Sequence, residues 1–203
     1  LSNGHGAQRK KAGMKMYYAH RRDDGKMQTL EEHLQGTAKR SGAFAAAFGA
    51  EAWGQLLGYA HDLGKASEAF QKRLLGGPKV DHATAGALEC KKKNLDLMGC
   101  CIAGHHSGLP DYGSPRIDMA GAPTYVGRVK KGEAGGIPPY SWQESLPAPG
   151  DMPRFANDTY SLSLWLRMLY SCLVDGDYLD TEDFMLGGTV CRGGYDSLPV
   201  LLE

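Results

Sequence analysis

The sequence lacks both a long hydrophobic stretch and an excess of charge of either sign. No apolar run approaches the roughly 20 residues that a membrane-spanning helix needs, and no signal-peptide pattern is present. Lysine plus arginine and aspartate plus glutamate each number 23, so the net charge favours no class of charged partner. A site for a polyanion must therefore come from local clustering of basic residues or from bound metal.

Cysteine is scarce and is not arranged in pairs that bind zinc. The five cysteines are Cys90, Cys100, Cys101, Cys172 and Cys191. An odd number without any C-x-x-C spacing argues against a disulfide framework and against a structural zinc site. We therefore expect a reducing, cytoplasmic environment, with the thiols buried as small hydrophobic side chains.

Alternating strand patterns and internal repeats are missing as well, whereas helical periodicity is frequent, so we predict an all-α fold. The length of 203 residues suits one domain. We assign residues 16–203 to this domain and residues 1–15 to a flexible leader of natural or artificial origin. A long insertion rich in glycine and proline, residues 107–153, precedes the last core helix.

Capping residues and hydrophobic periodicity predict where the helices lie. Thr29 and Glu32 form the pattern of a capping box, and the helix that follows directs His33 inward on the same face as Leu30. Further helices are expected over residues 51–62, from Ser67, from Asp81 as an N-cap, along the run from Leu95 to Ile102, and over residues 158–174.

Seven residues at the ends or on the inner faces of five predicted helices carry imidazole or carboxylate groups. They are His33, His61, Asp62, His82, His105, His106 and Asp175. Asp175 is included because Met168 and Cys172 lead along one helix face to it, and a carboxylate at the end of a buried stripe is costly unless it is paired or binds a cation. Each residue alone is more often a satisfied core or surface side chain, but the set is better explained by a metal centre.

The set divides naturally around Asp62 as a carboxylate that bridges two ions. The remaining ligands would be His33, His61 and Asp175 for one ion, and His82, His105 and His106 for the other. Two divalent ions about 3.5–4 Å apart can generate a nucleophile from water and stabilise the leaving oxygen of a phosphoester. His20 is ambiguous and is left outside this site, and Asp177, Asp180, Glu182 and Asp183 are predicted to be solvated.

Lys65 lies one helical turn after the His61-Asp62 pair. Its ammonium group could place positive charge against a phosphate in the transition state, which would make it catalytic together with Asp62. The alternative is a surface lysine that pairs with Asp62 or Glu68.

The insertion interleaves basic and aromatic residues. The basic ones are Arg116, Arg128, Lys130 and Lys131, and the aromatic ones are Tyr112, Tyr125, Tyr140 and Trp142. Such a mixture suits a single nucleic-acid strand, through attraction to its backbone and stacking on its bases. It suits an ordinary surface loop equally well.

Five motifs follow one another along the chain: His33, His61-Asp62-Leu63-Gly64-Lys65, Asp81-His82, Gly104-His105-His106 and Leu173-Val174-Asp175. Their order resembles that of the HD superfamily of metal-dependent phosphohydrolases. The runs from Gly104 to Asp111 and from Val174 to Glu182 look like one branch in particular, the HD nuclease domain of the type I CRISPR-associated helicase-nuclease. The similarity extends from about Tyr17 to Asp183.

The resemblance implies an HD-domain helical bundle and a nuclease with two transition-metal ions, either iron, manganese, nickel or cobalt. It implies degradation of single-stranded DNA in CRISPR interference, an antiviral defence, beside a superfamily 2 helicase and the CRISPR surveillance complex. The chain contains no Gly-x-x-x-x-Gly-Lys-Ser/Thr nucleotide loop, so the helicase would be a separate part or polypeptide. Two other functions stay open: an HD-type nucleotide or cyclic-nucleotide phosphohydrolase, and a non-catalytic module that binds DNA or docks on a helicase.

Overall fold

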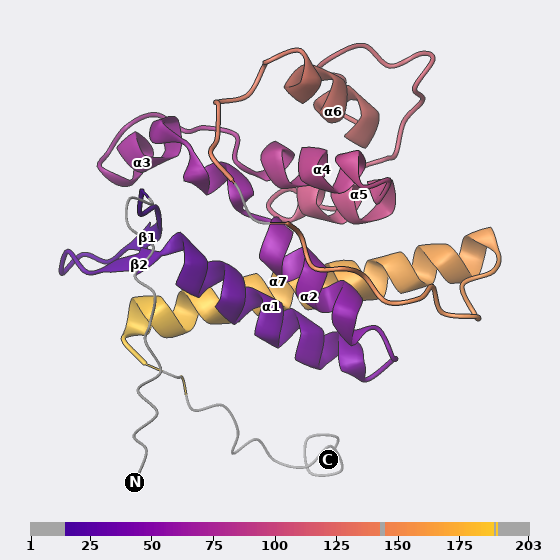
Figure 1. Ribbon diagram of the computed structural model, residues 1–203, viewed down its shortest axis with the longest axis horizontal. Coiled ribbons are helices and arrows are strands. Elements are labelled where there is room, and N and C mark those ends of the chain that lie inside the picture. Colours follow the sequence, from indigo (N-terminus) through magenta and orange to yellow (C-terminus); the bar gives the residue numbers. More distant parts are fainter. Residues whose placement is uncertain (1–14, 143–144, 189, 191–203) are drawn as a thin grey trace, which may run out of the picture.

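The computed structural model describes residues 15–142, 145–188 and 190, and most of these residues are helical (Figure 1). The elements are β1 (Tyr18–Arg21), β2 (Met27–Thr29), α1 (Leu30–Ala46), α2 (Glu51–Ala60), the 3-10 helix η1 (Leu63–Ala66), α3 (Glu68–Leu74), α4 (Ala83–Lys92), α5 (Asp96–Gly104), α6 (Tyr125–Glu133) and α7 (Thr159–Leu186). This content is compatible with the all-α prediction at the coarse level. The small antiparallel sheet of β1 and β2 is an element that the sequence pattern did not predict.

The start of α1 has the capping box that its sequence indicates. The Thr29 hydroxyl accepts a hydrogen bond from the Glu32 amide at 3.2 Å, and the Glu32 carboxylate accepts one from the Thr29 amide at 2.9 Å. Because the cap fixes the helical phase, His33 lies on the buried face beside Leu30 and Leu34. The β1–β2 hairpin pairs Tyr18 with Thr29, which brings β1 against the beginning of α1.

Three helices form the central layer: α2 turns back along α1, and the long helix α7 crosses them (Figure 1). A Cβ atom on Gly58 would lie 2.5 Å from the backbone of Ala38, so the glycine allows α1 and α2 to approach closely. Trp165, Leu169 and Leu173 on α7 are fully buried in the core that these helices share. Burial of such apolar side chains is the main force that holds the layer together.

The helices α4 and α5 form a second pair, and α6 covers it (Figure 1). Residues 107–153 are therefore not loop alone, because α6 lies within them. Periodicity failed to indicate α6 because glycines and lysines interrupt its short apolar stripe of Tyr125, Val126 and Val129. These three side chains are nevertheless buried, since the helix packs on its neighbours.

The cysteines and the expected leader can be compared with the structure only where it describes them. Among the described residues the cysteines Cys90, Cys100, Cys101 and Cys172 are free and buried, as expected. Cys191 and the leader residues 1–14 lie outside the described residues. None of the helices in the described part of the chain combines the length and the hydrophobicity that a membrane span requires.

Candidate metal centre

Imidazole and carboxylate side chains from five helices meet at one place between α1, α7 and the ends of α2, α4 and α5. They form two groups, in each of which the ligand atoms lie within 4.8 Å of one another: His33, His61, Asp62 and Asp177, and Asp62, His82, His105 and His106. Asp62 belongs to both groups, as expected of a bridging carboxylate. The structure thus brings together six of the seven side chains that the sequence singles out.

The seventh residue, Asp175, lies in neither group: it is exposed, and Asp177 lies in the first group instead. The reason is the phase of α7, whose fully buried face runs through Leu169 and Leu173. That face continues one turn later to Asp177, whereas Asp175 points to the other side of the helix. Cys172, on which the prediction of Asp175 depended, lies at the edge of the buried face at 8% exposure.

Four of the histidines are oriented by a hydrogen bond from the Nδ1 atom. His61 Nδ1 lies 2.8 Å from the carbonyl oxygen of Gly58, and His105 Nδ1 lies 2.7 Å from that of Ile102. His82 Nδ1 has the carbonyl of Val80 at 3.3 Å, and His33 Nδ1 has the Asp180 carboxylate at 2.9 Å. Because these oxygens can only accept, a ring that binds an ion in its neutral form would carry its proton on Nδ1 and direct the Nε2 lone pair to the centre of the site.

The Nε2 atoms surround the Asp62 carboxylate at distances that suit shared ligands. Oδ1 lies 3.3 Å from Nε2 of His82 and 3.4 Å from Nε2 of His105. Oδ2 lies 3.2 Å from Nε2 of His33 and 3.3 Å from Nε2 of His61. Metal–ligand bonds of about 2.0–2.2 Å place neighbouring ligands about 2.8–3.6 Å apart, from octahedral to tetrahedral geometry.

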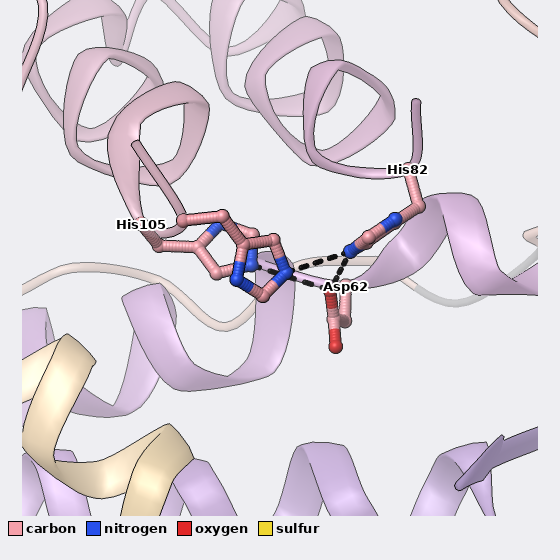
Figure 2. A group of neighbouring side chains, drawn as sticks. Asp62, His82 and His105 are labelled. Carbon is pink, nitrogen blue, oxygen red and sulfur yellow. Dashed lines mark hydrogen bonds and ion pairs between the residues drawn. The ribbon is translucent and has the colours of Figure 1, made fainter. Parts of the chain in front are cut away.

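Three of these buried atoms form no hydrogen bond: Nε2 of His61, Nε2 of His105 and Oδ1 of Asp62. A neutral imidazole here would direct its Nε2 lone pair at a carboxylate oxygen that repels it, and buried acceptors left unpaired are costly. A cation between them would satisfy all three atoms at once. The donor set of nitrogen and carboxylate oxygen also suits divalent first-row metals, so the residues fit such ions. Figure 2 shows the Asp62 carboxylate facing the rings of His82 and His105.

His33 differs from the other candidate ligands because its Nδ1 partner is a carboxylate. Asp180 accepts from His33 and also from the side-chain amide of Gln28 at 2.9 Å. A carboxylate behind a metal-binding histidine fixes its tautomer and increases its basicity. Asp180 was predicted to be solvated, yet it is buried at 9% exposure, one turn beyond Asp177 on the same face of α7.

Lys65 and His20 lie beside the first group. The Lys65 ammonium group is 2.6 Å from Oδ2 of Asp62 and 3.1 Å from Nε2 of His20. The sequence left open a catalytic lysine or a surface lysine paired with Asp62 or Glu68. The structure shows the ion pair with Asp62, but the lysine is buried rather than on the surface. His20 was left out of the predicted site because a single histidine in a short strand gives no periodic signal that would show which way it points.

The charges of the centre shift the pKa values of its members in opposite directions. Burial tends to raise the pKa of Asp62, but Lys65 and His61 outweigh it and hold this pKa well below its ordinary value. Burial tends to lower the pKa of His61, but the Asp62 and Asp177 carboxylates raise it to about 10. Burial dominates for His106, whose pKa falls to about 4. The carboxylates are thus ionised at neutral pH and available as ligands.

The two groups differ in their access to solvent. The side chains of His33, His61, Asp62 and His105 are fully buried, whereas that of His82 is 14% exposed and His106 is exposed. The centre is therefore open to solvent on the side of His82 and His106.

The four basic residues of the insertion do not form one surface. Arg116 and Lys131 are exposed. The Lys130 ammonium group instead donates to the carbonyls of Pro115 and Asp118, both at 2.7 Å, and Arg128 reaches into the protein, to Ala103 and Asp81. Of the four, Arg116 and Lys131 are thus the exposed residues, whereas the charged groups of Lys130 and Arg128 have partners within the protein.

Comparison with protein-family models finds no match, and comparison with curated proteins finds none. The arrangement of the side chains is therefore the basis for any statement about function.

Proposed function

We propose that this protein is a metal-dependent hydrolase of phosphodiester bonds with single-stranded DNA as its substrate. The observation that carries the proposal is the pair of histidine–aspartate groups that share Asp62. Two ions held there would supply a nucleophile from water at neutral pH and would offset the charge on the phosphate. Iron, manganese, nickel and cobalt all suit this donor set.

The chain's own residues divide the remaining work. Asp62 belongs to both groups, and hydrogen bonds of the Nδ1 atoms hold the histidine rings in place. Lys65 provides a buried positive charge 2.6 Å from Asp62. This positive charge would stabilise the negative charge that develops on a phosphate near the centre in the transition state.

The choice of single-stranded DNA comes from two observations. The order of the motifs resembles that of HD nuclease domains of CRISPR-associated helicase-nucleases, and the exposed residues Arg116 and Lys131 add basic charge to the insertion. The same resemblance supports a superfamily 2 helicase and the CRISPR surveillance complex as partners, and antiviral defence as the role. A nucleotide phosphohydrolase would need the same metal centre, so the substrate has to be tested directly.

The test uses labelled single-stranded DNA and a panel of nucleoside phosphates and cyclic nucleotides. We expect Mn²⁺ to support cleavage of the DNA, and a chelator or the Asp62→Ala variant to abolish it. Cleavage of nucleotides but not DNA would replace the substrate in this proposal. Binding of DNA without turnover in any divalent metal would instead support a non-catalytic module.

A further inference from the structure

One arginine of the insertion, Arg128, contacts residues next to the candidate metal centre. Arg128 lies on α6, which covers α4 and α5 (Figure 1). Its Nη1 donates a hydrogen bond to the carbonyl oxygen of Ala103, and its Nη2 lies 3.6 Å from Oδ1 of Asp81. One guanidinium group thus bridges the end of α5 and the segment before α4.

Both partners of Arg128 adjoin ligands of the second group. Ala103 lies two residues before His105 and three before His106, in the last turn of α5. Carbonyls in the last turn of a helix have no partner within the helix, and a cation there is favoured by the helix dipole. Asp81 directly precedes His82, and its carboxylate accepts from the amide and hydroxyl of Thr84 at 3.1 and 2.7 Å.

The helix that carries Arg128 is itself fixed. Thr124 caps it by accepting from the Gly127 amide at 3.0 Å, and the buried Tyr125 donates to Asp96 on α5 at 3.1 Å. Val129 is buried next to Arg128 in the sequence. The guanidinium group therefore projects from a helix that is itself anchored, and its two contacts link the segment before α4 to the end of α5.

We infer that Arg128 is a positioning residue for the second ligand group. It holds His82 against His105 and His106, and α6 acts as a clamp on the half of the centre that faces solvent. The inference rests on the proposed metal centre, but it concerns how the ligands are held and not the reaction. The first group has no such dependence, because apart from the shared Asp62 its members are His33 on α1, His61 at the end of α2 and Asp177 on α7.

The test measures ion binding rather than activity. Ion-free protein is titrated with Mn²⁺ by calorimetry, and electron paramagnetic resonance distinguishes a coupled pair of ions from a single one. In Arg128→Ala we expect the affinity for one ion to fall roughly 10–100-fold, as for the loss of other supporting contacts at metal sites, with the other ion unchanged. Arg128→Lys should be intermediate, because a single ammonium group can reach one of the two partners but not both.

Three further variants sharpen the result. Asp81→Asn keeps an acceptor for Thr84 but removes the charge that faces Arg128, so it should weaken the same ion as Arg128→Ala. Arg116→Ala, on the exposed loop, and Lys131→Ala, on the exposed side of α6, should bind both ions as the wild type does. If Arg128→Ala fails to fold, the ion affinities of Arg128→Lys and Asp81→Asn test the inference: weaker binding of one ion supports it, and wild-type binding of both ions overturns it.

The outcomes separate this inference from the proposed function. Two ions bound at wild-type affinity in Arg128→Ala would overturn the inference and leave the metal centre intact. Equal weakening of both ions would also overturn it, because a general disturbance of the core would then be the cause. A wild-type protein that binds no ion would overturn both the inference and the proposed function.

Discussion

Asp62 is the residue on which the two ligand groups converge, so its removal should affect the whole centre. We expect Asp62→Ala to lose both ions, because each group loses an oxygen ligand. His33→Ala should weaken mainly one ion, since His33 belongs to one group. Metal analysis of the purified variants measures this, with Asp175→Ala as a control because Asp175 is exposed. Equal retention of metal in Asp62→Ala and His33→Ala would refute these roles.

Lys65 is expected to act on the reaction more than on the ions. Its ammonium group lies beside Asp62 but, as a cation, cannot be a ligand. Lys65→Ala should therefore lower turnover by about a hundredfold, the usual effect of removing one group that stabilises charge in the transition state. Metal content should stay near that of the wild type. Steady-state kinetics and elemental analysis test this, with the exposed Lys72→Ala as a control. Loss of metal would show that the lysine holds the carboxylate in place.

Sequence reasoning found the histidines because His33, His61, His105 and His106 continue or directly follow an apolar helical face, and His82 opens a predicted helix. It missed Asp177 and Asp180 because it ended the last helix near Val174, although Leu169 and Leu173 lead at helical spacing to both aspartates. His20 could not be found in this way. Its place beside Lys65 depends on the hairpin, which brings together residues far apart in the sequence.

At the scale of elements, the contact of α4 with the end of α2 fixes how the ligand-bearing segments meet. A Cβ atom on Gly86 of α4 would lie 1.9 Å from the carbonyl oxygen of Ala60, the residue before His61. The clash is with the backbone of Ala60, which cannot move aside as a flexible side chain could. We therefore expect Gly86→Ala to destabilise the fold by about 1–3 kcal/mol. The gain in helix propensity, at most about 1 kcal/mol, should not compensate.

Urea unfolding measures this effect through the shift of the midpoint. Gly150→Ala is the matched control, because its Cβ would make an ordinary contact of 3.7 Å with Ala52. A Gly86→Ala protein as stable as the wild type would show that α2 and α4 can separate freely. In that case the close approach of the two helices would not be what sets the distance between His61 and His82.

Element boundaries were predictable where local signals exist and not elsewhere. The capping pattern at Thr29 and the serine cap at Ser67 both mark the observed helix starts. The helix α7 extends to Leu186 because its later turns bury Gly176 and Asp180 against α1, a tertiary contact without a local signature. Similarly, α6 is stabilised by packing on α4 and α5 more than by its own sequence.

For the molecule as a whole, the buried histidines make the stability of the ion-free protein depend on pH in two directions. Burial lowers the pKa of His20 from 6.5 to about 2, so below pH 6.5 the unfolded chain binds a proton that the folded one does not. Stability therefore falls as the pH is lowered. His61 behaves oppositely, since burial is outweighed by Asp62 and Asp177 and its pKa is raised to about 10. The stability that its charge contributes is lost as the pH rises from 6.5 towards 10.

The ion-free protein should therefore be most stable near pH 6.5. Bound ions should reverse the trend above this value, because they require neutral imidazoles and bind more tightly as protons are released. At an ion concentration 100 times the dissociation constant the added stability is about 2.7 kcal/mol. Urea unfolding below, near and above pH 6.5, with chelator or with Mn²⁺, measures both curves. Stabilisation by Mn²⁺ that does not grow with pH would mean that the ion is not held by the histidines, because ligands that release no proton bind it equally at each pH.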